Sequence, residues 1–257
     1  MRHDCSPDLP PHLTILTGGS RGMGLALARQ LLDAGHHVIS IARQTNAGLQ
    51  ASAGSALEQW TLDLSDGAAA AQQLRQWLQA QRAAPWASAT LINNAGVIPA
   101  IAPLSASDPL ELARALRVGL EAPMLLSAAF LGATEGWGVP RKVLNISSGL
   151  GRRAMASQSA YCAAKAGMDH FTRCLALDEA GKPHGARVCS LAPGVIDTDM
   201  QVQLRSAEPA HFPDAGNFAQ LKAGGLLTSP DEAARRVLAW LARPDFGQQP
   251  VADVRDA

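Results

Sequence analysis

Short apolar runs alternate with longer amphipathic stretches along most of the chain. The runs that are apolar almost throughout, as strands buried on both faces are, cover residues 13–18, 37–43, 57–64, 89–96, 141–148, 186–194 and 249–254. Helical periodicity covers residues 23–35, 68–84, 107–133, 157–180 and 229–243. We expect the third of these helices to be interrupted or bent near Pro123. Strands separated by helices predict an α/β fold: a doubly wound, Rossmann-type parallel sheet of about seven strands with helices on both faces.

This alternation breaks down between residues 201 and 228, which contain Pro209, Pro213 and two consecutive glycines. A long irregular segment in a compact domain is more often functional than not. We therefore predict one domain over residues 1–257 with an irregular, substrate-covering insertion at about 201–228. Its apolar side chains either cover a ring-shaped substrate as a lid does or are plain packing; they are Leu204, Phe212, Phe218 and Leu221.

Charge and composition exclude several classes of protein. The 257 residues carry 22 basic and 22 acidic side chains, which is not the electrostatic footprint of a nucleic-acid binder. No apolar run approaches the ~18 residues of a membrane span, and residues 1–13 lack the apolar core of a signal peptide. We expect no metal site. The four cysteines lack CxxC spacing and are interpreted as reduced thiols of a cytoplasmic protein; they are Cys5, Cys162, Cys174 and Cys189.

The segment TGGSRGMG (17–24) joins the first predicted strand to the first helix. This is the context in which spaced glycines let a backbone approach the pyrophosphate of a dinucleotide. The second strand ends at Arg43, where an NAD-binding protein would have a carboxylate for the ribose, and Arg21 lies within the glycine segment. Two guanidiniums suit a 2′-phosphate, so the sequence favours NADP(H). At either position alone, a solvated surface arginine is the alternative.

The only tyrosine of the chain, Tyr161, stands four residues before Lys165, so the two share one face of a helix. A nearby ammonium favours the phenolate, and lowering a phenol pKa by about three units takes about 4 kcal/mol. Such a phenol can donate a proton to a carbonyl oxygen as hydride reaches the carbon. Ser148, at the end of the fifth strand, is placed to hydrogen-bond that oxygen; Ser147 faces the other way and is the weaker candidate.

Five motifs, TGGSRGMG, NNAG, NISS, YCAAK and PGVIDTDM, stand in the order and spacing of the short-chain dehydrogenase/reductases, and the resemblance covers residues 13–200. It implies that Ser148, Tyr161 and Lys165 are catalytic. It also implies a set of residues that bind the cofactor: Gly18, Ser20, Arg21, Gly22, Met23, Gly24, Arg43, Asp63, Leu64, Asn93, Ala95, Gly96, Tyr161, Lys165, Pro193, Gly194, Ile196 and Thr198.

One position departs from the family. The resemblance implies an asparagine in the middle of the fourth helix, which bends the helix and anchors a water of the proton relay. Gly119 occupies that place in LRVGLEAP. Glycine permits the bend but offers no side chain to the water, so either another group replaces it or turnover is reduced.

Beyond residue 200, the chain resembles sepiapterin reductases and the similar bacterial benzil reductases. In the pterin enzymes an aspartate of the last segment anchors the guanidine-like edge of the pterin, and the matching position is Asp253, for which a plain surface carboxylate is the alternative. We therefore expect substrate to contact Ser148, Tyr161 and Asp253. The prediction is an NADPH-dependent carbonyl reductase that acts on a ketone or vicinal dicarbonyl. The alternatives are a reductase of the 3-oxoacyl-(carrier protein) type and a non-catalytic nucleotide-binding regulator.

Assembly is expected only by analogy with the family, whose dimer surface is formed by helices matching 107–133 and 157–180. These helices carry apolar side chains that would serve either a symmetric patch or the core: Leu125, Leu126, Phe171, Leu175 and Leu177. We expect a homodimer or homotetramer.

Overall fold

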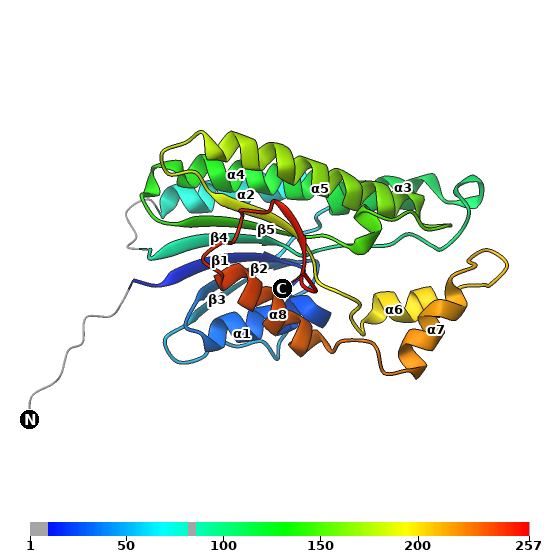
Figure 1. Ribbon diagram of the computed structural model, residues 1–257. Coiled ribbons are helices and arrows are strands. Elements are labelled where there is room, and N and C mark those ends of the chain that lie inside the picture. The colour runs from blue at the N-terminus through cyan, green and yellow to red at the C-terminus, as the bar shows by residue number, and fades with distance from the viewer. Residues whose placement is uncertain (1–9, 82–85, 257) are drawn as a thin grey trace, which may run out of the picture.

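Seven parallel strands form one sheet in the order β3-β2-β1-β4-β5-β6-β7 (Figure 1). The structure is a computed structural model and describes residues 10–81 and 86–256. The strands are β1 (His12–Thr17), β2 (His37–Ala42), β3 (Ala56–Thr61), β4 (Ser88–Asn93), β5 (Arg141–Ile146), β6 (Arg187–Ala192) and β7 (Val251–Asp253). The chain builds outward from β1 to β3 and then returns to the other side of β1 with β4. The predicted doubly wound α/β fold is thereby confirmed.

Helices cover both faces of this sheet (Figure 1). One face carries α2 (Gly67–Ala80), α4 (Ala122–Thr134) and α5 (Ser159–Ala180), and the other carries α1 (Gly22–Asp33) and α8 (Pro230–Ala242). Successive residues of each strand therefore enter different cores: Ile15 packs with the first group and Leu16 with the second, and neither is exposed to solvent. Burial on both faces explains why the strands are apolar without alternation.

The predicted helix 107–133 is present in three parts. It consists of α3 (Pro109–Leu116), a π-helical turn (Arg117–Glu121) and α4. The interruption predicted near Pro123 is confirmed, because the π-helical turn ends two residues before that proline. The backbone N–H of Ala122 bonds to the carbonyl oxygen of Arg117, five residues earlier, and Pro123 has no N–H with which to continue the helical bonding. Short 3₁₀ turns lie elsewhere, at Leu104–Ala106, Glu135–Trp137 and Gly149–Gly151.

The same helical segment corrects the expectation that no stretch is long and apolar enough for a membrane. Pro109–Trp137 passes that test, with a mean hydropathy of 1.3 over its most apolar window. More than half of that window is buried, and Leu126, Ala129 and Phe130 are fully buried against the sheet. This helical segment is therefore apolar because it packs in the core on one face of the sheet.

The insertion is helical, not irregular as expected. It contains α6 (Asp199–Arg205), whose first residues precede it, and α7 (Ala215–Ala223). A small core of its own holds these helices together, with Phe212 stacked on Phe218 at 5.7 Å between ring centroids. Leu204 and Ala215 complete that core. Packing thus accounts for these apolar residues, although Leu204 and Phe218 also border the cavity described below.

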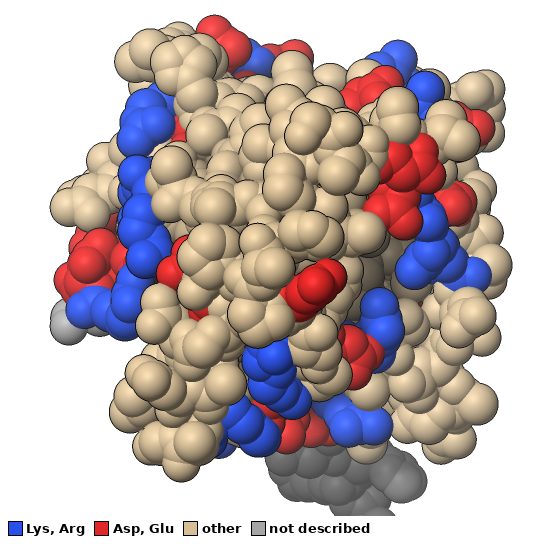
Figure 2. Space-filling view, turned by 90° about the vertical axis from the view of Figure 1, so that its right-hand side faces the viewer, with Lys and Arg blue, Asp and Glu red and all other residues tan. Residues whose placement is uncertain are grey.

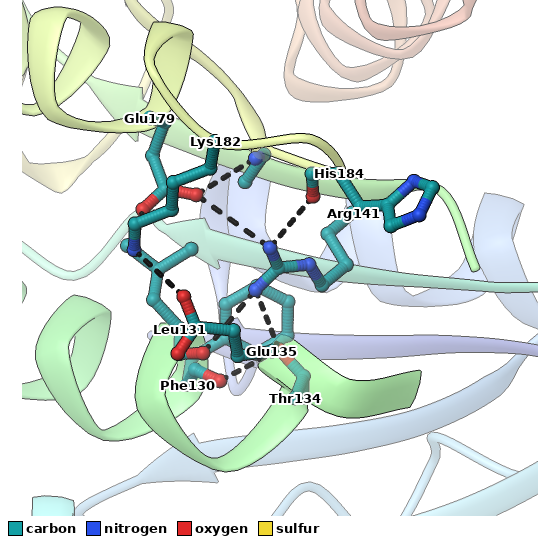
Figure 3. A network of polar contacts seen from close by, with 9 residues as sticks. Phe130, Leu131, Thr134, Glu135, Arg141, Glu179, Lys182 and His184 are labelled. Carbon is teal, nitrogen blue, oxygen red and sulfur yellow. Dashed lines mark hydrogen bonds and ion pairs between the residues drawn. The ribbon is translucent and has the colours of Figure 1, made fainter. Parts of the chain in front are cut away.

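A buried ion-pair network closes the opposite, amino-terminal edge of the sheet (Figure 3). Arg141, at the start of β5, lies 3.6 Å from the carboxylate of Glu179 at the end of α5 and donates hydrogen bonds to the carbonyl oxygens of Leu131 and His184. Burial alone would raise the pKa of Glu179, but hydrogen bonds from Lys182 and the Ala186 backbone hold that pKa below its usual value. All charges of this network are paired.

The residues expected at a subunit interface divide between core and surface. Leu126 is fully buried and Leu175 nearly so, which makes them core residues, whereas Leu177 is 77 % exposed. The cysteines within the described residues, Cys162, Cys174 and Cys189, form no disulfide; Cys5 lies outside those residues.

Candidate active site

A cavity of about 1190 Å³ opens at the carboxyl ends of the strands. Open α/β sheets bind their ligands at this edge, where the strand order reverses. Here the reversal lies between β1 and β4, and the loops that follow both strands line the cavity. Figure 2 views the molecule from this side. Uncharged residues form the upper middle of this face, and basic and acidic side chains lie below them and toward the margins of the face.

The glycine segment forms the part of the cavity beside β1. Gly18 and Gly22 have φ of +72° and +54°, the left-handed region that favours glycine. A Cβ at Gly24 would lie 2.0 Å from the carbonyl oxygen of Gly18, so the turn has no room for a side chain there. Arg21 precedes α1 without capping it, and no side chain among residues 10–81 and 86–256 binds the first N–H groups of that helix. Uncapped N–H groups above a glycine cradle fit the phosphates of a dinucleotide.

The two arginines predicted for the 2′-phosphate have different surroundings. Arg21 donates a hydrogen bond to Asp199 at 2.6 Å, and both side chains are largely exposed. Arg43 borders the cavity and makes no side-chain hydrogen bond or ion pair within the described residues. A backbone hydrogen bond from Ser65 lowers the pKa of the nearby Asp63, aided by the charges of Arg114, 3.8 Å away, and of Arg43. Within the described residues Arg43 thus lies near a carboxylate but forms no ion pair within 4 Å.

Ser148, Tyr161 and Lys165 meet on the cavity wall formed by β5 and α5. Ser148 follows β5 in extended backbone; its hydroxyl accepts a hydrogen bond from the backbone N–H of Leu150 and lies close enough to the Tyr161 phenol to lower the pKa of that phenol. The ammonium of Lys165 lies 5.7 Å from the Tyr161 ring centroid and donates a hydrogen bond of 2.7 Å to the carbonyl oxygen of Ile146. Both Tyr161 and Lys165 are nearly buried. A hydroxyl, a phenol and an ammonium thus converge where a carbonyl group can reach them.

The expected lowering of the tyrosine pKa is not what this arrangement produces. Burial raises the pKa of Tyr161 to about 12, and the hydrogen bond with Ser148 opposes only part of that shift. Burial also lowers the pKa of Lys165 to about 8, against the attraction of Asp169. Burial is the largest cause of both shifts, because removal of water disfavours the charged form of each group. Tyr161 is therefore held as a neutral phenol, the form that can donate a proton.

Behind this wall lies Asp169, a buried carboxylate that belongs to none of the five sequence motifs. Its Oδ1 accepts hydrogen bonds from Ser147 at 2.6 Å and Ser190 at 2.7 Å, and Arg152 lies 3.4 Å from its Oδ2. Ser147 thus links the end of β5 to α5 through Asp169, and Ser190 links β6 to α5 through the same carboxylate. Asp169 follows Lys165 by four residues, and that spacing was the available signal for it.

Gly119 also contacts the catalytic helix. A Cβ at this position would lie 3.1 Å from the Cβ of Ala164, so the π-helical turn packs closely against α5 between Tyr161 and Lys165. A larger residue here requires the two helices to separate by a few tenths of an ångström.

Of the predicted cofactor residues, the structure keeps one away from the cavity. Asn93, on the last position of β4, turns into the interior and donates hydrogen bonds to Asn145 and Ser127. Asn94 borders the cavity instead. Successive strand residues face opposite sides, so one position decides which asparagine is available. The remaining predicted residues line the cavity: Gly18, Ser20, Arg21, Gly22, Met23, Gly24, Arg43, Asp63, Leu64, Ala95, Gly96, Tyr161, Lys165, Pro193, Gly194, Ile196 and Thr198, with Ser148 and Asp253.

Asp253 lines the cavity but is already engaged. Arg255 donates from Nε to Oδ1 at 2.8 Å and from Nη2 to Oδ2 at 2.6 Å, a bidentate pair. Three cavity arginines, Arg114, Arg153 and Arg255, were not predicted, because nothing local in the sequence distinguishes them from surface arginines. Within residues 10–81 and 86–256, no group of histidine, cysteine, aspartate or glutamate side chains is arranged to hold a metal ion.

Comparison with known proteins agrees with this geometry. Residues 12–209 match the family model for short chain dehydrogenase. The chain is 34 % identical to benzil reductase ((S)-benzoin forming) of Bacillus cereus over 91 % of this chain and 95 % of that protein. It is 32 % identical to sepiapterin reductase of Meriones unguiculatus, over 90 % of this chain and 92 % of that one.

Among solved structures, a short-chain dehydrogenase/reductase from Burkholderia vietnamiensis is 37 % identical, with a TM-score of 0.66 over 96 % of this chain and 98 % of that one. The family match covers most of the chain and includes the glycine turn, Ser148, Tyr161 and Lys165. The chain belongs to the short chain dehydrogenase family.

Proposed function

We propose that this protein is an NADPH-dependent carbonyl reductase that converts a ketone or vicinal dicarbonyl compound into an alcohol. The observation that carries the proposal is the convergence of Ser148, Tyr161 and Lys165 on one wall of a cavity that also contains the glycine turn. The hydroxyl and the phenol can address one carbonyl oxygen, and the glycine turn suits a dinucleotide beside it.

The cofactor would lie along the glycine turn and the loops that follow β4 and β6, where it contacts Gly18, Gly22, Ala95 and Gly194. When bound, the reduced nicotinamide supplies a hydride to the carbonyl carbon. The family uses NAD(P)(H). The preference for NADPH rests on Arg43, a guanidinium just after β2 that forms no ion pair within 4 Å in the described part of the chain and can bind a 2′-phosphate with bidentate hydrogen bonds.

The side chains of this chain have distinct roles in the reduction. Ser148 orients the carbonyl oxygen through a hydrogen bond. Tyr161, held protonated by burial, donates the proton that converts the developing alkoxide into the alcohol. The nearby Lys165 ammonium favours the phenolate left behind. Lys165 itself is kept in place by the carbonyl oxygen of Ile146.

The names of the relatives support this class of reaction, since both are reductases of similar length. The apolar side chains that border the cavity, Met155, Leu204 and Phe218, suit a ring-bearing substrate. The two relatives favour different candidates, an aromatic 1,2-diketone and a pterin with a side-chain ketone.

The test is the oxidation of NADPH by the purified protein with benzil and with sepiapterin, each repeated with NADH. We expect turnover of at least one substrate, at least tenfold faster with NADPH than with NADH at equal concentration. Absence of turnover with both substrates, while NADPH still binds, would contradict the proposal. Equal rates with NADH would leave a carbonyl reductase but remove its cofactor preference.

A further inference from the structure

The charged residues of the cavity are not evenly paired. Each of its acidic side chains has a basic partner within 4 Å: Asp63 with Arg114, Asp197 with Lys222 and Arg205, Asp199 with Arg21, and Asp253 with Arg255. Within the described residues, two cavity arginines have no such partner, Arg43 and Arg153. Arg43 lies at the end of β2, where the proposed cofactor phosphate would bind. Arg153 is therefore left without an assigned partner.

Arg153 belongs to the substrate side of the cavity. It follows the 3₁₀ turn Gly149–Gly151, which begins directly after Ser148, and its backbone N–H is bonded to the carbonyl oxygen of Gly149. This backbone anchor fixes the base of the side chain close to the catalytic hydroxyl. The side chain is exposed and makes no hydrogen bond within the described residues, so its guanidinium is free to receive a ligand.

Arg255 offers a second set of donors on the same side. Asp253 is almost fully buried and binds Nε and Nη2 of Arg255, which orients the guanidinium. Nη1 and the second N–H of Nη2 remain, and they form the other edge of the guanidinium. The side chain is 65 % exposed and lines the cavity. An arginine held in this way presents a preoriented donor edge to an oxyanion.

The same pair works against a ligand that donates hydrogen bonds. Both carboxylate oxygens of Asp253 accept from Arg255, and Oδ1 also accepts from the Arg255 backbone N–H. A ligand edge with two N–H donors would have to displace the guanidinium to bind both oxygens. The side chain of Arg255 thus changes Asp253 from a ligand acceptor into a residue that positions a donor.

We propose that the substrate is an acidic carbonyl compound, an aldehyde or ketone that carries a carboxylate, and that Arg153 and the outer edge of Arg255 bind this carboxylate. The inference rests on the proposed reductase function. It specifies the substrate class, because the unpaired guanidinium of Arg153 and the free outer edge of Arg255 match an oxyanion. Asp253 acts as a positioning residue for Arg255.

The experiment compares acids with their own methyl esters, which differ mainly in charge. Benzoylformate and 4-acetylbenzoate place the carboxylate at two distances from the ketone, and each is assayed with NADPH beside its ester. We expect kcat/KM at least tenfold higher for the acid of one pair. Arg153→Met should lower kcat/KM for that acid by about 10- to 100-fold, mainly through KM, and leave the ester within twofold.

Three further variants separate binding from folding. Arg153→Lys keeps the charge and should recover part of the loss. Asp253→Asn should raise KM for the acid through misorientation of Arg255, and by a larger factor than it raises KM for the ester. Arg75→Met, on the exposed side of α2 and away from the cavity, is the matched control and should change nothing.

The outcomes distinguish the two proposals. If the esters or benzil are reduced and neither acid is preferred, or if Arg153→Met lowers acid and ester equally, the carboxylate inference is wrong and the reductase function stands. If nothing is reduced, the proposed function fails, and calorimetric titration of both acids into the protein with NADPH decides the inference. Binding by the wild type that is weakened in Arg153→Met supports it, and absence of binding overturns it.

Discussion

The two edges of the sheet use the same residue types in opposite ways. At the amino-terminal edge, the side chains of Arg141 and Glu179 are each only 2 % exposed, and both also hydrogen-bond to backbone groups (Figure 3). At the carboxyl-terminal edge, Arg21 and Asp199 are 71 % and 75 % exposed, and the guanidinium of Arg43 has no carboxylate partner within the described residues. At the amino-terminal edge the charged side chains are buried and paired with one another, whereas at the carboxyl-terminal edge they are exposed beside a cavity.

The difference shows what burial does to a charged group. Removal of one partner from a buried pair leaves an uncompensated charge and costs about 3–5 kcal/mol of stability. An exposed pair contributes about 0–1 kcal/mol, so its side chains are free to exchange partners. The amino-terminal edge therefore stabilises the fold, whereas the carboxyl-terminal edge is suited to binding. Mutations at the two edges should separate these properties.

The largest effect is expected at the open edge. Tyr161→Phe removes the proton donor and should lower kcat by about 10²- to 10⁴-fold. The free energy of unfolding should change little, because phenylalanine keeps the buried ring and only the phenol hydroxyl is lost. Steady-state reduction of benzil beside a urea titration measures both quantities. Wild-type turnover in this variant would disprove the assigned role of Tyr161.

The next largest effect is expected at the closed edge. Arg141→Met leaves Glu179 buried beside a reduced set of partners and should lower the free energy of unfolding by about 3–5 kcal/mol. The kcat of the folded fraction should stay within twofold. Urea titration measures the loss, and the exposed pair of Arg235 and Glu232 in α8 provides the control, since Arg235→Met should cost less than about 1 kcal/mol. Equal costs for both variants would contradict the comparison.

A smaller effect should distinguish the two arginines beside the glycine turn. Arg43→Met should raise the Kd for NADPH about 10- to 100-fold, the value of a charge-assisted bidentate contact, and leave the Kd for NADH within twofold. Arg21→Met should have a smaller effect, because Asp199 competes for that guanidinium. Calorimetric titration of both cofactors measures these changes. A larger effect at Arg21 than at Arg43 would reverse the assignment.

The smallest change needs no mutation. The pKa of Lys165, lowered by burial to about 8, places the loss of its charge within the working pH range. The protonated ammonium favours the phenolate that forms as Tyr161 donates its proton, so kcat/KM for reduction should fall above about pH 8, by about tenfold per pH unit. Lys165→Arg, which stays charged, should move this decline out of the range. A wild-type kcat/KM that does not change between pH 7 and 9 would contradict this prediction.

Much of the fold could be predicted because its signals are local. Apolar runs mark strands buried on both faces, and helical periodicity marks the layers that cover them. The predicted runs exceed the observed strands at their carboxyl ends; residues 89–96, for example, overlap β4 (Ser88–Asn93) and continue for three residues that border the cavity. The chain continues past the sheet there as the loops that line the cavity, and the pattern of apolar residues does not mark where the strand ends.

The features of the candidate site also fall into those that follow from local sequence and those that depend on tertiary packing. The glycine turn and the pairing of Tyr161 with Lys165 depend on spacings of a few residues, so the sequence by itself determined them. Only the tertiary structure decided that Asn93 faces inward, that Asp199 meets Arg21 across 178 residues, and that burial raises the pKa of Tyr161. These properties depend on which distant segments pack together and how much water they exclude, and no local pattern of residues contains that information.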